Sequence, residues 1–277
     1  MGGSLACMLA MTIAGRETTR ELDVFQVMEM RSIIGLAMLY PLVLKSGGIG
    51  AMRTTMPLQH ILRNIAHYAG QALWLFALTL IPLAQLIAIE FTAPIWTALL
   101  AMVFLGERMN LWKTAAIISG LIGVGIIVRP GVGEVNVGQL VVLAAAVCFA
   151  VSFVLVKALT RKDSAVKIIF WMLVIQSLIG LVPAIHAWQW PSAHVWPWIF
   201  AIAFAGSYAH YCMARALAHA DATVVMPMDF VRVPATAFVG WLVYSEQIDI
   251  FTAFGAALIL GGNLLNLMAR NRRIAPA

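Results

Sequence analysis

The feature that most constrains this chain is a series of apolar segments that follow one another with only short loops between them. A helix needs about 20 apolar residues to cross the hydrocarbon core of a bilayer, and most of these segments are about that long. Apolar residues make up 62% of the 277 residues and charged residues 11%, whereas a soluble domain carries about 25% charged residues. We therefore expect an all-α integral membrane protein with ten transmembrane helices, at residues 2–14, 24–44, 63–81, 83–105, 112–129, 138–159, 166–188, 195–217, 222–244 and 251–269.

The positions of Lys and Arg predict the orientation of these helices. Most of the basic residues lie at one set of segment ends, and only Arg16, Arg20 and Arg129 lie at the other set. Because cytoplasmic loops are enriched in Lys and Arg, we expect both termini in the cytoplasm, with the protein in the bacterial inner membrane. The net charge of +6 is thus explained without a nucleic-acid partner.

The chain also repeats itself. An offset of 145 residues pairs Ser32–Leu36 with Ser177–Leu181, and an offset of 139 pairs Glu90 with Asp229. Because a repeat of five helices is odd, the second copy crosses the membrane in the opposite sense, as in many secondary transporters that bind substrate between the halves. The two expected repeats cover residues 1–130 and 137–273.

The same comparison predicts a short first helix. Leu5 falls opposite Ala150, in the middle of segment 138–159. The first half of segment 138–159 therefore has no counterpart at the start of the chain, and we expect the first helix to be clipped at its N-terminus.

Charged residues inside the expected helices are candidates for binding a substrate or a coupling proton, because each costs about 2.5–3.5 kcal/mol to insert unless it is paired or hydrated. They are Glu29, Arg31, Glu90, Asp229 and Arg232. Glu90 and Asp229 each precede a proline, which removes a backbone hydrogen bond one turn earlier. An acidic pair beside a central cavity is one interpretation. A structural salt bridge between Asp229 and Arg232 is the other, and snorkelling to the membrane surface competes for Glu29 and Arg31.

A polar and aromatic stripe predicts one wall of a binding site. His67, Gln71 and Trp74 recur at helical spacing, with Tyr68 adjacent. The corresponding helix of the second repeat offers Tyr208 and Tyr211 among its polar residues. Aromatic walls with a few polar groups suit a flat organic ligand.

Other residues are interpreted as structural. Glu107 and Glu246 follow two of the segments, and each is expected to cap the helix that comes next, where a carboxylate interacts favourably with the helix dipole. Glycines in segments 112–129 and 251–269 are expected to let these two helices pack closely; they are Gly120, Gly123, Gly125, Gly255, Gly261 and Gly262.

Cofactor and metal motifs were sought and none was found. The three cysteines lie in apolar runs without metal-ligand spacing, and the chain contains no HExxH, GxSxG or P-loop motif. We therefore expect no cofactor and no metal. A membrane enzyme and a non-transporting membrane scaffold remain the alternatives to a transporter.

Three stretches resemble the ten-helix EamA-type permeases of the drug/metabolite transporter superfamily. They are FQVMEMRSIIGL (25–36), ALTLIPLAQLIAIEFTAPIWTALLAMVFLGERMN (77–110) and GLIGVGIIV (120–128). The resemblance implies a secondary transporter of small organic metabolites, such as amino acids, amine-bearing nucleoside derivatives or riboflavin-like heterocycles. We expect a monomer in the lipid bilayer. A proton is one candidate for the coupling ion, whose identity the sequence leaves open.

Overall fold

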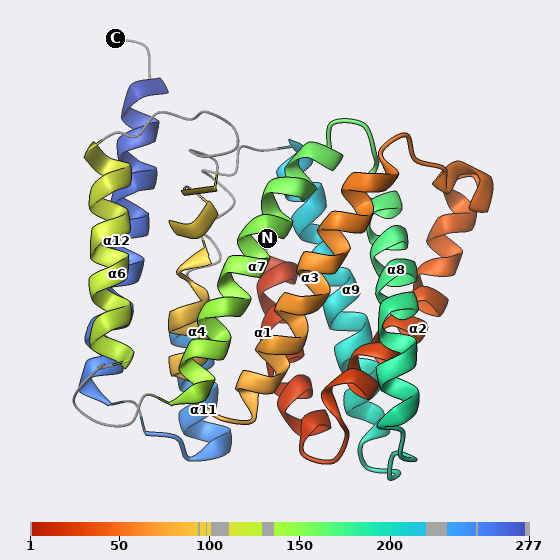
Figure 1. Ribbon diagram of the computed structural model, residues 1–277, viewed down its shortest axis with the longest axis horizontal. Coiled ribbons are helices and arrows are strands. Elements are labelled where there is room, and N and C mark those ends of the chain that lie inside the picture. Colours follow the sequence, from red (N-terminus) through yellow and green to blue (C-terminus); the bar gives the residue numbers. More distant parts are fainter. Residues whose placement is uncertain are drawn as a thin grey trace. The chain divides into compact units, whose positions relative to one another are not determined.

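The computed structural model of the chain describes residues 2–93, 95–97, 99–100, 111–128, 136–219, 232–247 and 249–274. Regular structure in these ranges is helical and includes no strand, which confirms the all-α prediction for this part of the chain. The helices (Figure 1) are α1 (Gly2–Thr19), α2 (Val24–Lys45), the 3-10 helix η1 (Ile49–Met52), α3 (Pro57–Leu78), α4 (Leu83–Glu90), α6 (Leu111–Val128), α7 (Val137–Leu159), α8 (Ala165–His186), α9 (Trp196–His219), α11 (Arg232–Tyr244) and α12 (Ile250–Ile274).

Three of the described helices, α2, α7 and α8, are long and apolar enough to cross a membrane. α4, with eight residues, is too short to cross by itself. The apolar helices indicate an integral membrane protein, while the arrangement of ten spans stays a prediction.

One face of α8 exposes large apolar side chains although the helix buries a glutamine. Leu178 is 69% exposed, Val182 63% and Ile185 62%, whereas Gln176 is fully buried. In water the apolar side chains would be inside and the glutamine outside. The outward face of α8 is therefore suited to contact with lipid.

α1 and α3 both differ from the expected segments. α1 continues to Thr19 rather than residue 14, and the hydroxyls of Thr18 and Thr19 donate to carbonyls one turn earlier, each at 2.8 Å. α3 begins at Pro57 rather than residue 63. A proline is favoured in the first helical turn because the N–H that it lacks would have no partner there.

The single helix expected at residues 83–105 is interrupted. α4 ends at Glu90, Phe91 and Thr92 form a turn, and helical backbone resumes at Ala93. Pro94 in the sequence accounts for the break, because proline has no N–H to donate to the Glu90 carbonyl four residues earlier. Residues 101–110 of this segment, with Glu107, lie outside the described residues, as do residues 222–231 of the ninth segment.

The chain divides into two compact units. Unit 1 consists of Met1–Leu75 and Ser152–Ala220, and unit 2 of Phe76–Val151 and Asp221–Ala277. Each unit therefore contains helices of both expected repeats.

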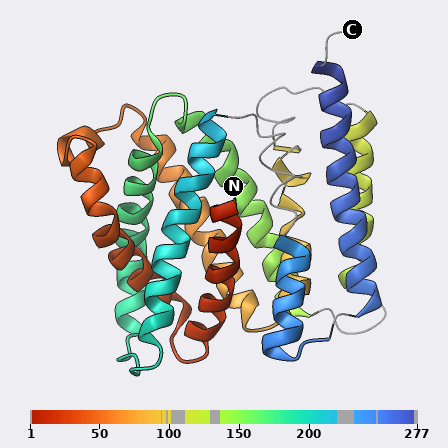
Figure 2. The same ribbon diagram turned by 180° about the vertical axis from the view of Figure 1, so that it is seen from behind.

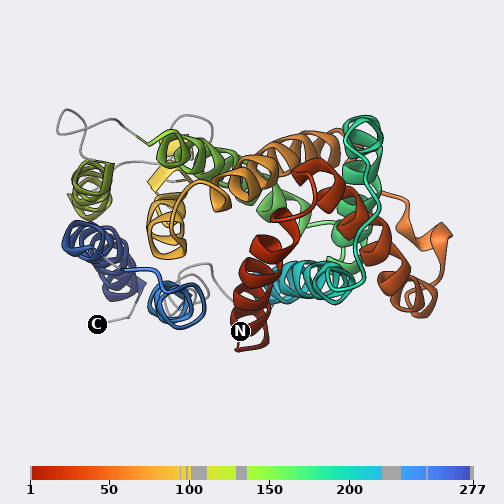
Figure 3. The same ribbon diagram turned by 90° about the horizontal axis from the view of Figure 1, so that it is seen from below.

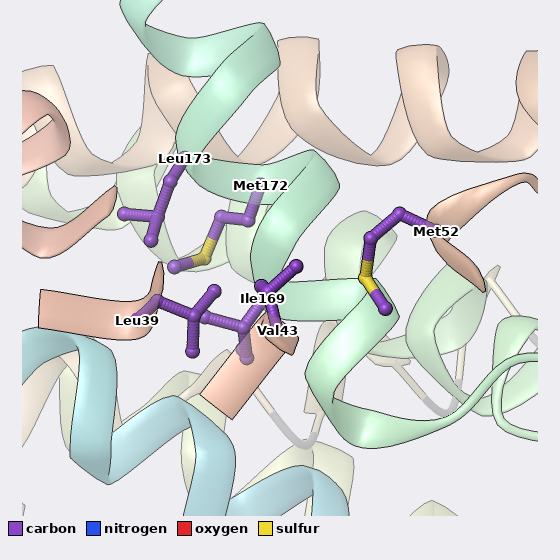
Figure 4. Packing of buried hydrophobic residues seen from close by; sticks show 6 residues of the cluster. All are labelled: Leu39, Val43, Met52, Ile169, Met172 and Leu173. Atoms are coloured by element: carbon purple, nitrogen blue, oxygen red, sulfur yellow. The ribbon is translucent and has the colours of Figure 1, made fainter. Parts of the chain in front are cut away.

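In unit 1, α2 and α8 pack side by side (Figures 1 and 2) and run antiparallel, because Arg31 contacts Gln176 whereas the later Gly35 approaches the earlier Leu173. An apolar cluster fills the space between these helices and η1 (Figure 4), and burial of such side chains contributes about 1.5–3 kcal/mol each in water. The cluster consists of Leu39, Val43, Met52, Ile169, Met172 and Leu173.

In unit 2, α6 and α12 lie side by side in all three views, and Figure 3 looks nearly along their axes. A Cβ added to Gly123 would lie 2.7 Å from the Gly255 carbonyl oxygen, and one added to Gly255 would lie 2.6 Å from the Gly123 oxygen. The predicted close packing is therefore confirmed for these two glycines. At Gly125 and Gly261 no described heavy atom lies within 4 Å of an added Cβ, so the close packing expected there stays a prediction.

Glu246 caps a different helix from the one expected. Its Oε2 accepts a hydrogen bond from the backbone N–H of Leu83 at 2.9 Å, at the start of α4. α12, the helix that follows Glu246, is instead capped by Asp249, which accepts from the N–H of Thr252 at 2.7 Å. Glu246 caps α4 although α12 is nearer in sequence, because the packing of unit 2 brings the start of α4 to Glu246.

A buried carboxylate joins the start of α3 to the loop before α8 in unit 1. Asp163 Oδ2 accepts from Thr54 Oγ1 at 2.6 Å and lies 2.9 Å from His60 Nε2, and Oδ1 lies 3.0 Å from Lys167 Nζ. Burial alone would raise the pKa of Asp163, but the hydrogen bonds from Thr54, His60 and Lys167 outweigh it, and the net effect lowers this pKa below its ordinary value of 3.8. The ionised form of Asp163 is thus the one that stabilises the fold.

Asp163→Asn should therefore lower the melting temperature of the detergent-solubilised protein at pH 7. The loss of charged hydrogen bonds corresponds to about 1–3 kcal/mol, or roughly 2–10 °C in a chain of this size. Because the folded-state pKa is depressed, the stabilisation is present above the ordinary pKa and is lost as pH falls through the folded-state value. The melting temperature of the variant should accordingly depend less on pH below pH 5 than that of the wild type. Glu17→Gln, which removes an exposed pair with Arg20, serves as control; equal pH profiles for wild type and Asp163→Asn would contradict the prediction.

Candidate functional site

A buried arginine, Arg31, joins three helices of unit 1. It is 2% exposed, and its Nη2 donates to Gln71 Oε1 on α3 at 3.0 Å and to Gln176 Oε1 on α8 at 2.6 Å. Both partners are neutral amides. In the described part of the chain no carboxylate lies within 4.0 Å of this guanidinium, so its positive charge is hydrogen-bonded without being neutralised.

A buried carboxylate, Glu29, lies two residues earlier on α2. It is also 2% exposed, and its Oε1 accepts a hydrogen bond from Ser177 Oγ at 2.5 Å. Gly180 lets α8 pass close to this carboxylate, because an added Cβ would lie 2.8 Å from Glu29 Oε2 and 2.8 Å from Tyr68 OH. The second carboxylate oxygen and the Tyr68 hydroxyl therefore face the same point on α8.

We call Glu29, Arg31, Tyr68, Gln71 and Gln176 the Arg31 cluster. Four of its buried polar atoms have no hydrogen-bond partner among the described residues: Glu29 Oε2, Arg31 Nη1, Tyr68 OH and Gln176 Nε2. An unsatisfied buried polar atom costs about 1–3 kcal/mol, and folded proteins leave few of them. Such a concentration at one place indicates atoms that bind something other than the chain itself.

α9 covers the guanidinium with a glycine. A Cβ added to Gly206 would lie 3.5 Å from Arg31 Nη1, and the neighbouring Ser207 has a buried hydroxyl without a hydrogen-bond partner among the described residues. The sequence places the smallest residue where this helix crosses Arg31.

The stripe expected on α3 is buried along its length. His67 is 3% exposed, Tyr68 7%, Gln71 9% and Trp74 4%. The members have different surroundings: Gln71 and Tyr68 belong to the Arg31 cluster, whereas His67 Nδ1 lies 3.4 Å from Ser152 Oγ and the His67 ring meets the His210 ring edge-on at 4.8 Å.

The structure does not bring Tyr208 or Tyr211 to the Arg31 cluster. Tyr208 is 43% exposed and stacks on Phe204 with ring centroids 5.5 Å apart. Tyr211 packs against the apolar cluster of α2 and α8, and its hydroxyl accepts from Arg215 at 3.2 Å. The reason is rotational: the face of α9 that meets Arg31 carries Gly206, and the two tyrosines point elsewhere.

Unit 2 holds the other charged candidates. Arg232 Nη2 donates to Glu90 Oε1 at 2.5 Å, and the guanidinium lies 5.1 Å from the centroid of the Phe91 ring. The two side chains are 5% and 14% exposed. This pair joins the end of α4, at the helix break, to the start of α11. Asp229, the partner that the sequence suggested for Arg232, lies outside the described residues.

Sequence reasoning missed Gln176 and Ser177 as site residues, although Gln176 is the counterpart of Arg31 at the offset of 145. Snorkelling, the alternative considered for Glu29 and Arg31, does not fit two side chains that are 2% exposed and bonded to α3 and α8.

Metal and disulfide chemistry has no site in the described ranges. No three His, Cys, Asp or Glu side chains there are placed to hold a metal ion. Cys7, Cys148 and Cys212 are free thiols.

The chain matches a protein-family model twice. The model of the EamA-like transporter family covers residues 3–129 and again residues 136–268. One solved crystal structure shares the fold, with a TM-score of 0.67 and 20% sequence identity over 99% of this chain and 97% of that chain.

Characterised relatives carry different cargoes. The chain is 31% identical to a riboflavin transporter of Rhizobium johnstonii, over 87% of this chain and 82% of the relative. It is 24% identical to an S-adenosylmethionine uptake transporter of Rickettsia prowazekii, over 91% and 85%. It is 25% identical to a pseudopaline exporter of Pseudomonas aeruginosa, over 88% and 86%.

The Glu90–Arg232 pair generates a stability prediction. Glu90→Gln removes one carboxylate from the buried Arg232 guanidinium, and Arg232→Gln removes one guanidinium from the Glu90 carboxylate. Each variant should therefore lower the free energy of unfolding, by up to about 3–5 kcal/mol. The double variant replaces two charges by two amides and should lose much less than the sum. Thermal unfolding in detergent measures the three values. The exposed pair of Glu17 and Arg20 is the matched control, with an expected coupling below about 1 kcal/mol; additive effects at Glu90 and Arg232 would show that the pair contributes no net stability.

Proposed function

Because the chain belongs to the EamA-like transporter family, we propose that this small-metabolite transporter works as a secondary, alternating-access carrier in the bacterial inner membrane. Family membership favours transport over the enzyme and scaffold alternatives. The single observation that carries the proposal of a binding site is the buried Arg31, whose guanidinium has no carboxylate within 4.0 Å among the described residues.

Several contacts support two inverted repeats, at residues 1–130 and 137–273, with ten spans in total. The counterpart helices α2 and α8 run antiparallel, as an inverted repeat requires. Their contacts with other helices also correspond. Gly35 on α2 approaches Ser207 on α9, and Gly180 on α8 approaches Tyr68 on α3. Gly180 is the counterpart of Gly35 at the offset of 145, and Ser207 is the counterpart of Tyr68 at the offset of 139. The family model matches each half separately.

We assign the two charged sites different roles. The Arg31 cluster binds the substrate, and Trp74, one turn beyond Gln71 and buried, stacks on its flat part. The Glu90–Arg232 pair lies at a helix break. Binding of a proton or of a charged substrate group to Glu90 would separate it from Arg232 and change the local charge. A monomer and proton coupling complete the proposal.

Counterflow uptake by purified protein in proteoliposomes tests transport, with S-adenosylmethionine and riboflavin as labelled cargoes. At least one labelled cargo should accumulate transiently inside proteoliposomes that were preloaded with an excess of the same unlabelled compound. Trp74→Ala should raise the apparent KM about two- to twelve-fold, since stacking contributes about 0.5–1.5 kcal/mol beyond area burial. Glu90→Gln/Arg232→Gln should be inactive while still folded.

Trp96→Ala is the matched control for Trp74→Ala. The Trp96 indole N–H donates to Thr92 Oγ1 at 3.1 Å, in the turn just before its helix, so its removal should reduce folded yield more than affinity. A change in KM for Trp96→Ala with none for Trp74→Ala would show that the aromatic wall of the substrate site is not on α3, where we propose it. Normal uptake by the Glu90/Arg232 double variant would reduce that pair to a packing role.

Reporter fusions test the proposed orientation. An alkaline phosphatase inserted at residues 131–136 should be active, because the loop after five spans lies outside when the N-terminus is cytoplasmic. A green fluorescent protein fused after Ala277 should fluoresce, because it remains in the cytoplasm. An inactive phosphatase at 131–136 would contradict both the span count and the orientation.

A further inference from the structure

Two opposite charges are buried near each other in unit 1 without forming an ion pair. Arg31 is held by the amide oxygens of Gln71 and Gln176, and Glu29 by the hydroxyl of Ser177. No N–O distance of 4.0 Å or less joins Glu29 and Arg31. In a medium of low dielectric constant, opposite charges attract strongly. Residues two positions apart on a helix do not face each other, so each side chain has neutral partners and keeps one polar atom, Glu29 Oε2 and Arg31 Nη1, without a partner among the described residues.

The unpartnered atoms fall into two chemically different groups. Arg31 Nη1 and Gln176 Nε2 are donors, and their side chains are already joined by a hydrogen bond of 2.6 Å. Two adjacent donors, one of them charged, suit the two oxygens of a carboxylate. Glu29 Oε2 and Tyr68 OH both lie 2.8 Å from one point on α8, where a Cβ of Gly180 would be. A carboxylate oxygen beside a hydroxyl suits the N–H groups of an ammonium.

From this arrangement we infer that the Arg31 cluster recognises a zwitterion, the α-amino-acid end of the transported metabolite. The substrate carboxylate binds Arg31 and Gln176, and the substrate ammonium binds Glu29 and Tyr68. The inference rests on the proposed transport function and deepens it by naming the charges that a substrate must carry. The zwitterionic end brings a partner to each buried charge, and this end by itself adds no net charge to the membrane interior on binding.

The arrangement also separates the two cargoes used in the uptake assay. S-adenosylmethionine carries a carboxylate and an ammonium on one carbon atom, whereas riboflavin carries neither group. The Arg31 cluster therefore favours the first cargo, or another compound with the same end, over the second. Trp74, on the same helix as Gln71 and Tyr68, is placed for the remainder of such a molecule.

Binding to the purified wild-type protein in detergent, measured by calorimetry and thermal shift, tests the inference without requiring transport. The probes are S-adenosylmethionine, decarboxylated S-adenosylmethionine, riboflavin and the standard amino acids. At least one zwitterionic probe should bind, and the removal of the carboxylate from S-adenosylmethionine, or from the bound amino acid, should weaken affinity about 10- to 100-fold, as expected for loss of a hydrogen-bonded charge.

Variants of Arg31 identify the group that reads the carboxylate. Arg31→Gln should bind the zwitterion and its decarboxylated form equally weakly. Arg31→Lys should lie between this variant and the wild type, because lysine keeps the charge but loses the guanidinium fork. Arg215→Gln, which removes an exposed arginine on α9, is the matched control and should bind like the wild type.

Gly206→Ala tests the site by a second route, in case Arg31→Gln loses binding only because it folds poorly. It keeps every charge and adds one methyl group 3.5 Å from Arg31 Nη1, an ordinary contact distance that the fold should tolerate. The methyl group should weaken binding of the zwitterion more than that of its decarboxylated form.

Three results would overturn the inference. They are equal binding of S-adenosylmethionine and its decarboxylated form by the wild type, full carboxylate dependence in folded Arg31→Gln, and no binding of any zwitterionic probe. Riboflavin uptake together with the last result would leave the transport proposal standing while this inference fails. Zwitterion binding without uptake of any cargo would support this inference while the transport proposal fails.

Discussion

The structure of unit 1 depends on one interaction, the burial of the Arg31 guanidinium against two amide oxygens. Arg31 comes from α2, Gln71 from α3 and Gln176 from α8, so three helices meet at a single charged group. An arginine inside a membrane is expensive unless its charge is compensated. Glycines at positions 180 and 206 let α8 and α9 approach this region, and the polar atoms that remain unpartnered gather around it. The arrangement stabilises the helices only in part, which is consistent with a site that a ligand completes.

The family model matches both halves of the chain, but the charges of α2 are not repeated in α8. Gln176 is the counterpart of Arg31 at the offset of 145, and Val174 is the counterpart of Glu29. The second repeat thus supplies neutral residues where the first supplies an arginine and a glutamate. This difference lets α2 and α8 pack against each other without placing like charges in contact.

Sequence reasoning predicted what depends on local composition and missed what depends on packing. The length and apolarity of α2 and α8 were predictable, and so were the candidates Arg31 and Glu29, because a charge in an apolar segment is conspicuous. The offset of 145 identified α2 and α8 as counterparts but did not predict that they touch. Helical spacing found the buried stripe on α3, yet it assigned Tyr208 and Tyr211 to the site, because periodicity gives the relative faces of a helix and not the neighbour of each face. The capping partner of Glu246 was missed for the same reason.

The outward face of α8 alters which mutations unit 1 should tolerate. Lipid tails are as apolar as leucine, so helices in a bilayer gain little from removing such side chains from their surroundings and associate through packing and hydrogen bonds. Replacement of Leu178, which is 69% exposed, exchanges one hydrocarbon surface for another. Replacement of a small or polar residue such as Gly180 or Gln176 disturbs a helix contact directly. The large apolar positions on the outward face of α8 should therefore tolerate substitution better than the small and polar positions on the face that contacts α2 and α3.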